Sequence, residues 1–393
     1  MRLRQLREFL KLESTSGIIL IITALLALIL DNSPFAHFYE SSLHVPVSVH
    51  LGGWQLLQEP LLFWVNEGLM PLFFLLIGLE LKRELLIGHL SERNQVALPA
   101  IAAFGGMLVP AFIYTTINFH HPALLKGWAI PVATDIVFAL GILSLFGRRV
   151  PIGLKLFLMA LAIFDDIGAI LIIALFYGHA LLYFSLLLAL IVILVLALMN
   201  RFKVDRLFPY LLVGFLLWGI VLKTGIHATV AGVLLAFFIP LKSPSNLLEQ
   251  LERALHPWVA YVVMPAFAFA NAGLSFSHVG FSTLTDTVTL GIVWGLFIGK
   301  QLGVFSFAAV MIKLGFAKLP EKTSWLEFYG IAILCGIGFT MSLFLGTLAF
   351  ENGNPSYLVE VRLGVLLGSL LSALMSIVVL LTAFWIKKKR TRA

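Results

Sequence analysis

Two neighbouring carboxylates, Asp165 and Asp166, lie in the middle of a long apolar segment, residues 150–177. Lys155, near its start, is the only other charged residue in this segment. About 20 helical residues cross the hydrocarbon core of a bilayer, and one ionised Asp at its centre costs on the order of 3 kcal/mol. Acids at this depth usually face a water-filled path for a cation or a proton. The pair therefore predicts a site where protons and cations bind.

Two adjacent acids also have the chemistry to exchange one ligand for the other. Successive residues of an α-helix are about 100° apart, so Asp165 and Asp166 can share a cavity without pointing in the same direction. Two partly desolvated carboxylates hold a proton more readily than one does, and they can release it to an arriving cation. The alternative is a structural pair held by hydrogen bonds.

Lys300 is a third deeply placed charge, and it needs an acidic neighbour. We predict a salt bridge from Lys300 to one of the paired aspartates that breaks when a cation arrives; a permanent structural ion pair is the alternative.

Thr134 and Asp135 follow Pro131, where the helix is expected to break. Asp135 would then balance helix N-termini and Lys300 helix C-termini, while Thr134 and freed carbonyls would offer oxygen ligands to a hard cation.

The elements that position these residues are membrane-spanning helices. Of the 393 residues, 60% are hydrophobic and 12% are charged, and the mean hydropathy is +1.01. Soluble domains carry about twice as many charged residues, so we predict an all-α polytopic membrane protein, with one transmembrane domain over residues 1–393. About twelve apolar segments are long enough to cross a bilayer. They are residues 14–31, 61–82, 97–118, 127–146, 150–177, 181–200, 207–223, 225–241, 256–275, 288–312, 325–350 and 357–386.

Two of these segments look interrupted, one at Pro131 and the other at Gly336 and Gly338. Interrupted helices at corresponding places in two halves of a transporter point to a binding site near the membrane midplane. Each interrupted segment is the middle one of three, within residues 97–177 and 288–386. Because the two trios begin on opposite sides of the membrane, we predict that they are inverted repeats.

The longest loop, residues 31–60, contains the sequence VPVSVHLGGWQL. Alternating apolar residues before a Gly-Gly pair predict an outer β-hairpin, over residues 43–58. A lone hairpin is marginally stable in water. We therefore predict that residues 45–57 pair with a second copy of the chain; a hairpin lying on its own chain is the alternative.

The basic residues predict the orientation of the chain. With the N-terminus inside, all but four of the 27 Lys and Arg residues lie at inner positions, the exceptions being Lys126, Lys223, Lys300 and Arg362. This distribution predicts that both termini are cytoplasmic. The basic residues then face anionic membrane lipid, so the net charge of +7 does not require a nucleic-acid partner.

The single cysteine excludes an internal disulfide. The lack of a GK[ST] phosphate loop argues against a nucleotide. We therefore expect no cofactor.

Further charged residues gather at the inner ends of two apolar segments, at helical spacing. They are Glu80, Arg83, Glu84, Glu252 and His256. Alone, each fits a solvated charged rim. His227 fits a hydrogen-bonded interior histidine, although a histidine can also report pH.

Several long motifs, in order along nearly the whole chain, resemble those of NhaA-type sodium/proton antiporters. They are FFLLIGLELKREL, WAIPVATDIVFALG, ALAIFDDIGAI, LKTGIHATVAG, LHPWVAYVVMPAFAFANAG, LFIGKQLG and LCGIGFTMSLF. The resemblance implies twelve transmembrane helices, of which the fourth and eleventh are interrupted and cross. It also implies electrogenic export of Na⁺ or Li⁺ in exchange for protons, by alternating access, in the bacterial inner membrane at neutral to alkaline pH. Such a protein is a transporter and not an enzyme.

The resemblance also implies roles for individual residues. Asp165 and Asp166 would bind the proton and the Na⁺ or Li⁺, Thr134 and Asp135 would lie beside them, and Lys300 would be the intramembrane lysine. The charged rim and His227 would take part in pH regulation, and the hairpin would join a homodimer. Glu67 stands where many members of the family have Asp.

Two enzyme or pigment classes are alternatives. An intramembrane aspartyl protease would need aspartates on separate helices, typically in a GxGD-like motif, whereas the GIG of this chain is followed by Phe339. A retinal protein could use Lys300 for a Schiff base, but the number of predicted spans argues against it. Whether the rim or the aspartate pair sets the pH dependence stays open at this point.

Overall fold

The computed structural model describes residues 3–51, 54–87, 93–178, 182–351 and 353–390. Of these described residues, 79% are helical, which confirms the all-α class. In chain order the elements are α1 (Leu3–Asp31), α2 (Ala36–Leu43), β1 (Pro46–Leu51), β2 (Trp54–Pro60), α3 (Leu61–Phe63), η1 (Trp64–Leu69), α4 (Met70–Leu86), α5 (Arg93–Ile117), η3 (Leu124–Val132), α6 (Ile136–Leu145), η4 (Gly147–Arg149), α7 (Ile152–Phe176), α8 (Tyr183–Arg201), α9 (Leu207–Val221), α10 (Thr229–Phe238), α11 (Leu247–Trp258), η5 (Val259–Val263), α12 (Met264–Asn271), η6 (Phe276–His278), α13 (Phe281–Thr285), α14 (Thr287–Trp294), η7 (Gly295–Gly299), α15 (Lys300–Lys313), α16 (Trp325–Leu334), α17 (Phe339–Phe350) and α18 (Pro355–Arg390).

Many of these helices are long and apolar enough to cross a membrane. Within the described ranges eight helical segments meet this test, and there are nine if the bent pair Thr15–Asp31 and Ala36–Leu43 forms one span. The apolar helices α9 and α10 are shorter. Large apolar side chains on α8 are exposed, among them Leu187 and Leu190, as expected for a surface that faces lipid. The prediction of a multi-pass membrane protein is confirmed.

The chain divides into two compact units that are not contiguous in sequence. The first is formed within Met1–Ile22, His89–Ala169 and Leu274–Ala393, and the second within Thr23–Gly88 and Ile170–Gly273. All the deeply placed charges singled out in the sequence fall in the first unit, and all the rim residues fall in the second.

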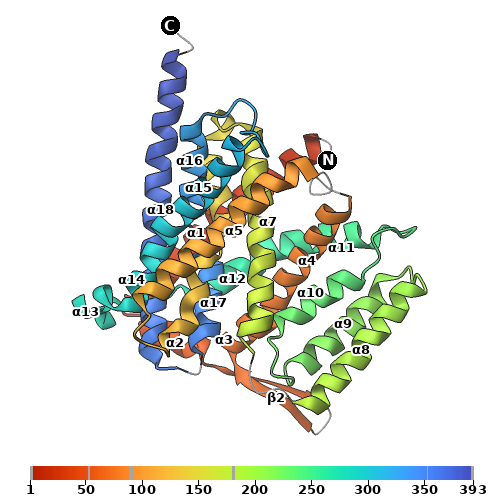
Figure 1. Cartoon of the computed structure of the whole chain (residues 1–393). Helices are drawn as coiled ribbons and strands as arrows, with labels where there is room; N and C mark the ends of the chain where they lie inside the picture. The colour runs from red at the N-terminus through yellow and green to blue at the C-terminus, as the bar shows by residue number, and fades with distance from the viewer. Residues whose placement is uncertain (1–2, 52–53, 88–92, 179–181, 352, 391–393) are drawn as a thin grey trace. The chain divides into compact units, whose positions relative to one another are not determined.

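In the first unit, α5 packs along α15, and α18 packs against α14, α16 and α17 (Figure 1). Helical structure stops twice inside apolar segments of spanning length. η3 ends at Val132 and α6 begins at Ile136, while α16 ends at Leu334 and α17 begins at Phe339. Gly338 lies in the second gap, where a Cβ would come within 2.9 Å of the Leu296 side chain and 3.0 Å of the Ala133 carbonyl oxygen. Only glycine allows this close approach without displacing a neighbour.

In the second unit, α4 packs against α10, and α8 and α9 lie side by side (Figure 1). The core between these helices is apolar and includes Leu79, Leu196, Leu217 and Leu248. The strands β1 and β2 form an antiparallel hairpin in which Val49 pairs with Leu57, with an irregularity between Val49 and His50. The first strand thus begins at Pro46 and the second ends at Pro60, whereas the sequence pattern predicts residues 43–58; Leu43 belongs to α2.

Candidate functional site

Asp165 lies at the centre of a buried polar cluster in the first unit. Its side chain projects from α7 and is 1% exposed. Its Oδ2 accepts hydrogen bonds from Lys300 Nζ at 2.5 Å and from Thr134 Oγ1 at 2.6 Å. Among the described residues, its Oδ1 has no hydrogen-bond partner. Leaving a buried carboxylate oxygen unpaired is costly, so this atom marks a position where a cation or a proton would be stabilised.

Thr134 connects the Asp165 carboxylate to the gap between α16 and α17. Its Oγ1 also lies 2.9 Å from the carbonyl oxygen of Cys335. A hydroxyl carries one proton, so Thr134 donates fully to only one of these two oxygens at a time. When it donates to Cys335, a protonated Asp165 can donate to Thr134. The same geometry therefore accommodates both the ionised and the protonated carboxyl group.

Asp135 caps the N-termini of two helices at once. It is the N-cap of α6, where its Oδ1 accepts from Phe138 N at 2.9 Å. At the start of α17, its Oδ2 accepts from Thr340 N at 3.1 Å and from Thr340 Oγ1 at 2.5 Å. Its own backbone N donates to the Ile337 carbonyl oxygen at 2.7 Å. One buried carboxylate therefore balances the partial positive charge of both N-termini and joins the two gaps.

Lys300 is fully buried at the start of α15, directly after the π-helical turn η7. Gly106 of α5 lies beside its side chain, because a Cβ there would be 3.6 Å from Nζ. Close packing of small residues between two helices excludes water and lipid from the ammonium group. Its bond to Asp165 is therefore a buried ion pair, and removing one partner would leave the other uncompensated.

Asp166, the next residue on α7, is 7% exposed. Its side chain leaves the helix about 100° away from that of Asp165. The structure thus places all five residues predicted for the ion site in one region of the first unit, because Asp166 adjoins Asp165 and Asp135 adjoins Thr134. Within the described part of the chain, no group of three His, Cys, Asp or Glu residues could hold a metal ion. A cation at the aspartates would therefore need hydroxyl, carbonyl or water oxygens as further ligands.

Five of the six residues predicted for pH regulation lie together in the second unit. Arg83 donates to Glu252 Oε1 at 2.5 Å and to Glu84 Oε1 at 3.0 Å. His256 Nε2 lies 3.9 Å from Glu80 Oε1. Burial raises the pKa of the Glu252 carboxyl, and the positive charge of Arg83 opposes this shift. The cluster is thus a buried and partly buried charge network rather than a fully solvated rim.

His227 lies apart from this network, because it pairs with Glu67. Its Nε2 is 2.6 Å from Glu67 Oε1, and its Nδ1 is 2.8 Å from Thr229 Oγ1. Glu67 lies in η1, about 20 Å along the helical segment from Glu80. His227 is therefore a hydrogen-bonded interior histidine with an acidic partner.

Sequence reasoning missed several polar residues that hold the two gaps. Thr340 binds Asp135, and Ser342 Oγ donates to the carbonyl oxygen of Ile130 at 2.6 Å. Ser369 Oγ of α18 accepts from Phe339 N at 3.3 Å, at the first residue of α17. A Thr and a Ser within four residues after Gly338, at an expected helix start, were the available signal.

Comparisons with known proteins identify the family of the chain. The sequence model of the family described as "Na+/H+ antiporter 1" matches residues 7–380. The Na(+)/H(+) antiporter NhaA 2 of Saccharophagus degradans is 53% identical over 379 residues, which cover 95% of this chain and 99% of that protein. The Na(+)/H(+) antiporter NhaA 1 of Pseudomonas putida is 55% identical over 369 residues, which cover 93% of each.

The structure is also similar to that of the sodium proton antiporter MjNhaP1 of Methanocaldococcus jannaschii. The TM-score is 0.51 and the sequence identity 15%, over 96% of each chain. At this identity the similarity supports a shared fold, whereas the family match and the two relatives above concern the sequence itself. The chain therefore belongs to the NhaA-type Na⁺/H⁺ antiporters, which are transporters and not enzymes.

Proposed function

We propose that this chain exports Na⁺ across the bacterial inner membrane in exchange for protons, with Asp165 and Asp166 as the ion site. The observation that carries the proposal is the buried Asp165 carboxylate. One of its oxygens is bound by Lys300 and Thr134, and the other has no hydrogen-bond partner among the described residues. Such an acid is balanced in the empty carrier and still offers an oxygen to a proton, Na⁺ or Li⁺.

In the proposed cycle, Na⁺ or Li⁺ reaches the carboxylates from the cytoplasm, displaces their protons and loosens the Lys300–Asp165 bond. The Thr134 hydroxyl and the Cys335 carbonyl lie next to Asp165 and are the further ligands that we propose. On the outer side, protons return to the carboxylates and the cation leaves. Two carboxylates serve one monovalent cation, which supports return of more than one proton per Na⁺ and hence electrogenic exchange.

Alternating access rests on the proposed architecture of twelve crossings. These are the eight long apolar segments together with α1, α9, α10 and the segment 256–275. We assign the gaps around Ala133 and Gly338 to the interrupted, crossing helices of inverted repeats, residues 97–177 and 288–386. Support comes from the contacts between the gaps, since Asp135 binds both N-termini. A shift of the two trios would then expose the site to one side of the membrane at a time.

The pH dependence that we propose, with activity at neutral to alkaline pH, arises chiefly at the aspartates. Protons and Na⁺ compete for the same carboxylates, so acid lowers the apparent Na⁺ affinity. The network of Glu80, Arg83, Glu84, Glu252 and His256 tunes this response. Its titratable groups lie close to one another, and one of them is an acid whose pKa burial raises, so its net charge can change with pH.

The remaining parts of the proposal concern the surroundings of the chain. Both termini face the cytoplasm, where most of the basic residues face membrane lipid. Two chains form a homodimer through residues 45–57. Support for this contact comes from Val47 and Val49, which are exposed and lie on one face of β1, and from the exposed Val45 just before the strand.

Cation-induced collapse of a pH gradient in inside-out vesicles tests the ion site. We expect Asp165→Asn and Asp166→Asn each to abolish the response to Na⁺ and Li⁺ while the protein stays folded. Asp205→Asn is the control. It replaces a partly exposed acid of the second unit and should behave like the wild type. Wild-type rates in either of the first two variants would contradict the assignment. Rates measured against Na⁺ at several pH values separate the two origins of pH dependence, because an acid loss that saturating Na⁺ cannot restore would assign control to the charged network.

A further inference from the structure

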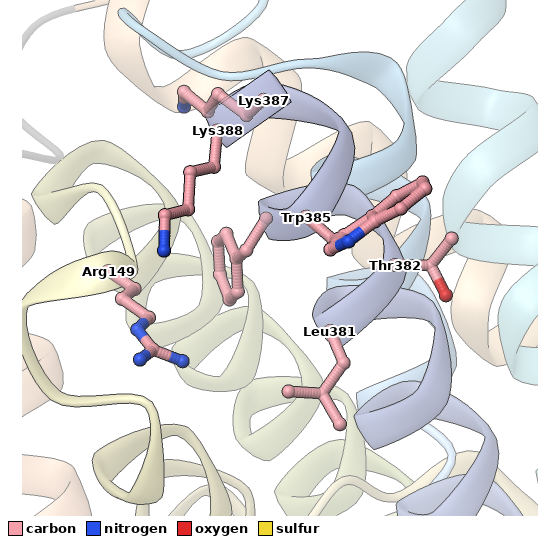
Figure 2. Close-up of a pocket in the computed structure, with 7 residues that line it drawn as sticks. Arg149, Leu381, Thr382, Trp385, Lys387 and Lys388 are labelled. Atoms are coloured by element: carbon pink, nitrogen blue, oxygen red, sulfur yellow. The ribbon is translucent and has the colours of Figure 1, made fainter. Parts of the chain in front are cut away.

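A pocket of about 810 Å³ lies beside the last turns of α18. Its lining combines the cations Arg149, Lys387 and Lys388 with the apolar side chains of Leu381 and Trp385. Figure 2 shows that Arg149, from the loop after α6, and Lys388, from α18, extend toward the same space. The pocket belongs to the first unit, and none of the residues predicted for the ion site lines it.

Arg149 is held at this pocket by the packing of its own loop. The loop contains the short helix η4, which begins at Gly147 with φ +57°, a left-handed conformation that favours glycine. The preceding Phe146 contacts Phe384 of α18 edge to face, with ring centroids 5.7 Å apart. This contact holds the loop against α18, so the backbone that carries Arg149 lies beside the pocket before any ligand binds.

Among the described residues that line the pocket, the charged ones are all basic. Lys387 donates to Glu327 Oε1 at 2.8 Å, and Glu327 is fully buried, so this acid balances Lys387. Arg149 and Lys388 supply two further positive charges, and the Lys389 ammonium lies 3.8 Å from the centre of the Trp385 ring. A phosphodiester has the charge and the acceptor oxygens that two such donors bind.

The apolar part of the pocket matches the boundary of a membrane. α18 has 36 residues and is therefore about 54 Å long, well beyond the roughly 30 Å of the hydrocarbon core. Its last turns thus reach the headgroup region. There, Leu381 and Trp385 are 48% and 58% exposed, and they precede Lys388 along α18 within about two helical turns. Exposed Trp next to Lys is typical of the interface between lipid tails and headgroups.

We propose that this pocket binds one anionic phospholipid, with its phosphodiester between Arg149 and Lys388 and an acyl chain along Leu381 and Trp385. Inorganic phosphate would satisfy the two cations but would leave the apolar side chains uncovered, so the occupant is the lipid. The loop at the pocket joins α6, which Asp135 caps, to α7, which carries Asp165. A bound lipid therefore restrains the connection between two helices of the ion site.

Native mass spectrometry of the purified full-length protein, titrated with phosphatidylglycerol, tests the proposal. We expect one phosphatidylglycerol to bind the wild type, and the double variant R149Q/K388Q to bind it at least about tenfold more weakly, because both charge-assisted bonds to the phosphate are lost. K313Q/K318Q is the matched control, since it removes two exposed cations of the same unit and should bind like the wild type. R149K/K388R keeps both charges and should restore most of the affinity.

Three outcomes would overturn the proposal. Equal weakening in K313Q/K318Q would mean that a diffuse basic surface attracts the lipid. Equal binding of zwitterionic phosphatidylcholine would mean that the phosphate cradle does not select anionic lipid. Displacement of phosphatidylglycerol by inorganic phosphate at comparable concentration would mean that the apolar wall contributes nothing. Melting curves give a second measurement. Phosphatidylglycerol should raise the Tm of the wild type and of R149K/K388R, and it should not raise the Tm of R149Q/K388Q.

Discussion

Replacing Asp135 is the sharpest test of how the two gaps are held together. Asp135→Ala leaves three donors without their acceptor, namely Phe138 N, Thr340 N and Thr340 Oγ1. Asp135 is 1% exposed and Thr340 is fully buried, so water does not readily replace the lost carboxylate. Each buried donor that loses its partner costs about 1–3 kcal/mol. Because the three losses overlap, we expect a total of about 3–5 kcal/mol.

The matching substitution Asp135→Asn keeps one acceptor oxygen and removes the charge. We expect it to cost less, about 1–2 kcal/mol, since an Asn can still cap one of the helices. At roughly 2 °C per kcal/mol, Asp135→Ala should lower Tm by about 6–10 °C and Asp135→Asn by about 2–4 °C. Both variants should also need more Na⁺ for half-maximal exchange, because the first turn of α17 loses bonds that Thr340 donates to the Asp135 side chain, in the same gap region that Thr134 contacts.

Thermal unfolding in detergent and exchange in vesicles check both expectations. Asp205→Ala is the control, because Asp205 is only partly buried and accepts from Ser245 Oγ at 2.8 Å in a loop region. It should change Tm little. An Asp135→Ala protein that melts like the wild type would refute the conclusion that this carboxylate caps both helices. Equal losses in the Ala and Asn variants would show that charge, and not the number of hydrogen bonds, dominates.

Three further predictions concern other parts of the molecule. Lys300→Ala leaves the Asp165 carboxylate buried and uncompensated, so we expect a loss of about 3–5 kcal/mol and a shifted pH profile of exchange; a variant with the melting curve and profile of the wild type would exclude both roles. Deleting residues 45–57 should give a folded, transporting monomer in light scattering, and a dimer of unchanged stability would rule out the hairpin as the contact. Because burial raises the pKa of Glu252, its contribution to stability is fully present below the ordinary value of 4.5 and is lost as pH rises through the raised pKa. Glu252→Gln lacks this titration, so its Tm should rise relative to the wild type over that window, and a constant difference across a pH series would contradict the burial argument.

The deep charges of the site could be predicted from sequence because their cost in a membrane is so large. An apolar segment that contains Asp165 and Asp166, and another that contains Lys300, leave few explanations besides mutual pairing and ion binding. The contact between Lys300 and Asp165 confirms the salt bridge, whereas its breaking on arrival of a cation stays a prediction. The all-α class followed in the same way from composition.

Other contacts could not be predicted because they join segments far apart in the chain. Asp135 was expected at a helix N-terminus, but nothing in its neighbourhood says that the start of α17, 205 residues away, shares its carboxylate. The pairing of His227 with Glu67 likewise depends on how α10 packs near η1. Pattern and composition report the burial of each residue, whereas these contacts depend on tertiary packing.

The charges around Asp165 support the electrogenic exchange that we propose. The cluster holds three carboxylates, those of Asp135, Asp165 and Asp166, and one ammonium, that of Lys300. The two helix N-termini at Asp135 each contribute about half a positive charge, so the ionised, empty cluster carries about one negative charge in excess. One Na⁺ brings this sum to about zero, and two protons bring it to about plus one. For exchange of two protons against one Na⁺, the two loaded forms differ by one charge, and a membrane potential acts on that difference at about 2.3 kcal/mol per 100 mV.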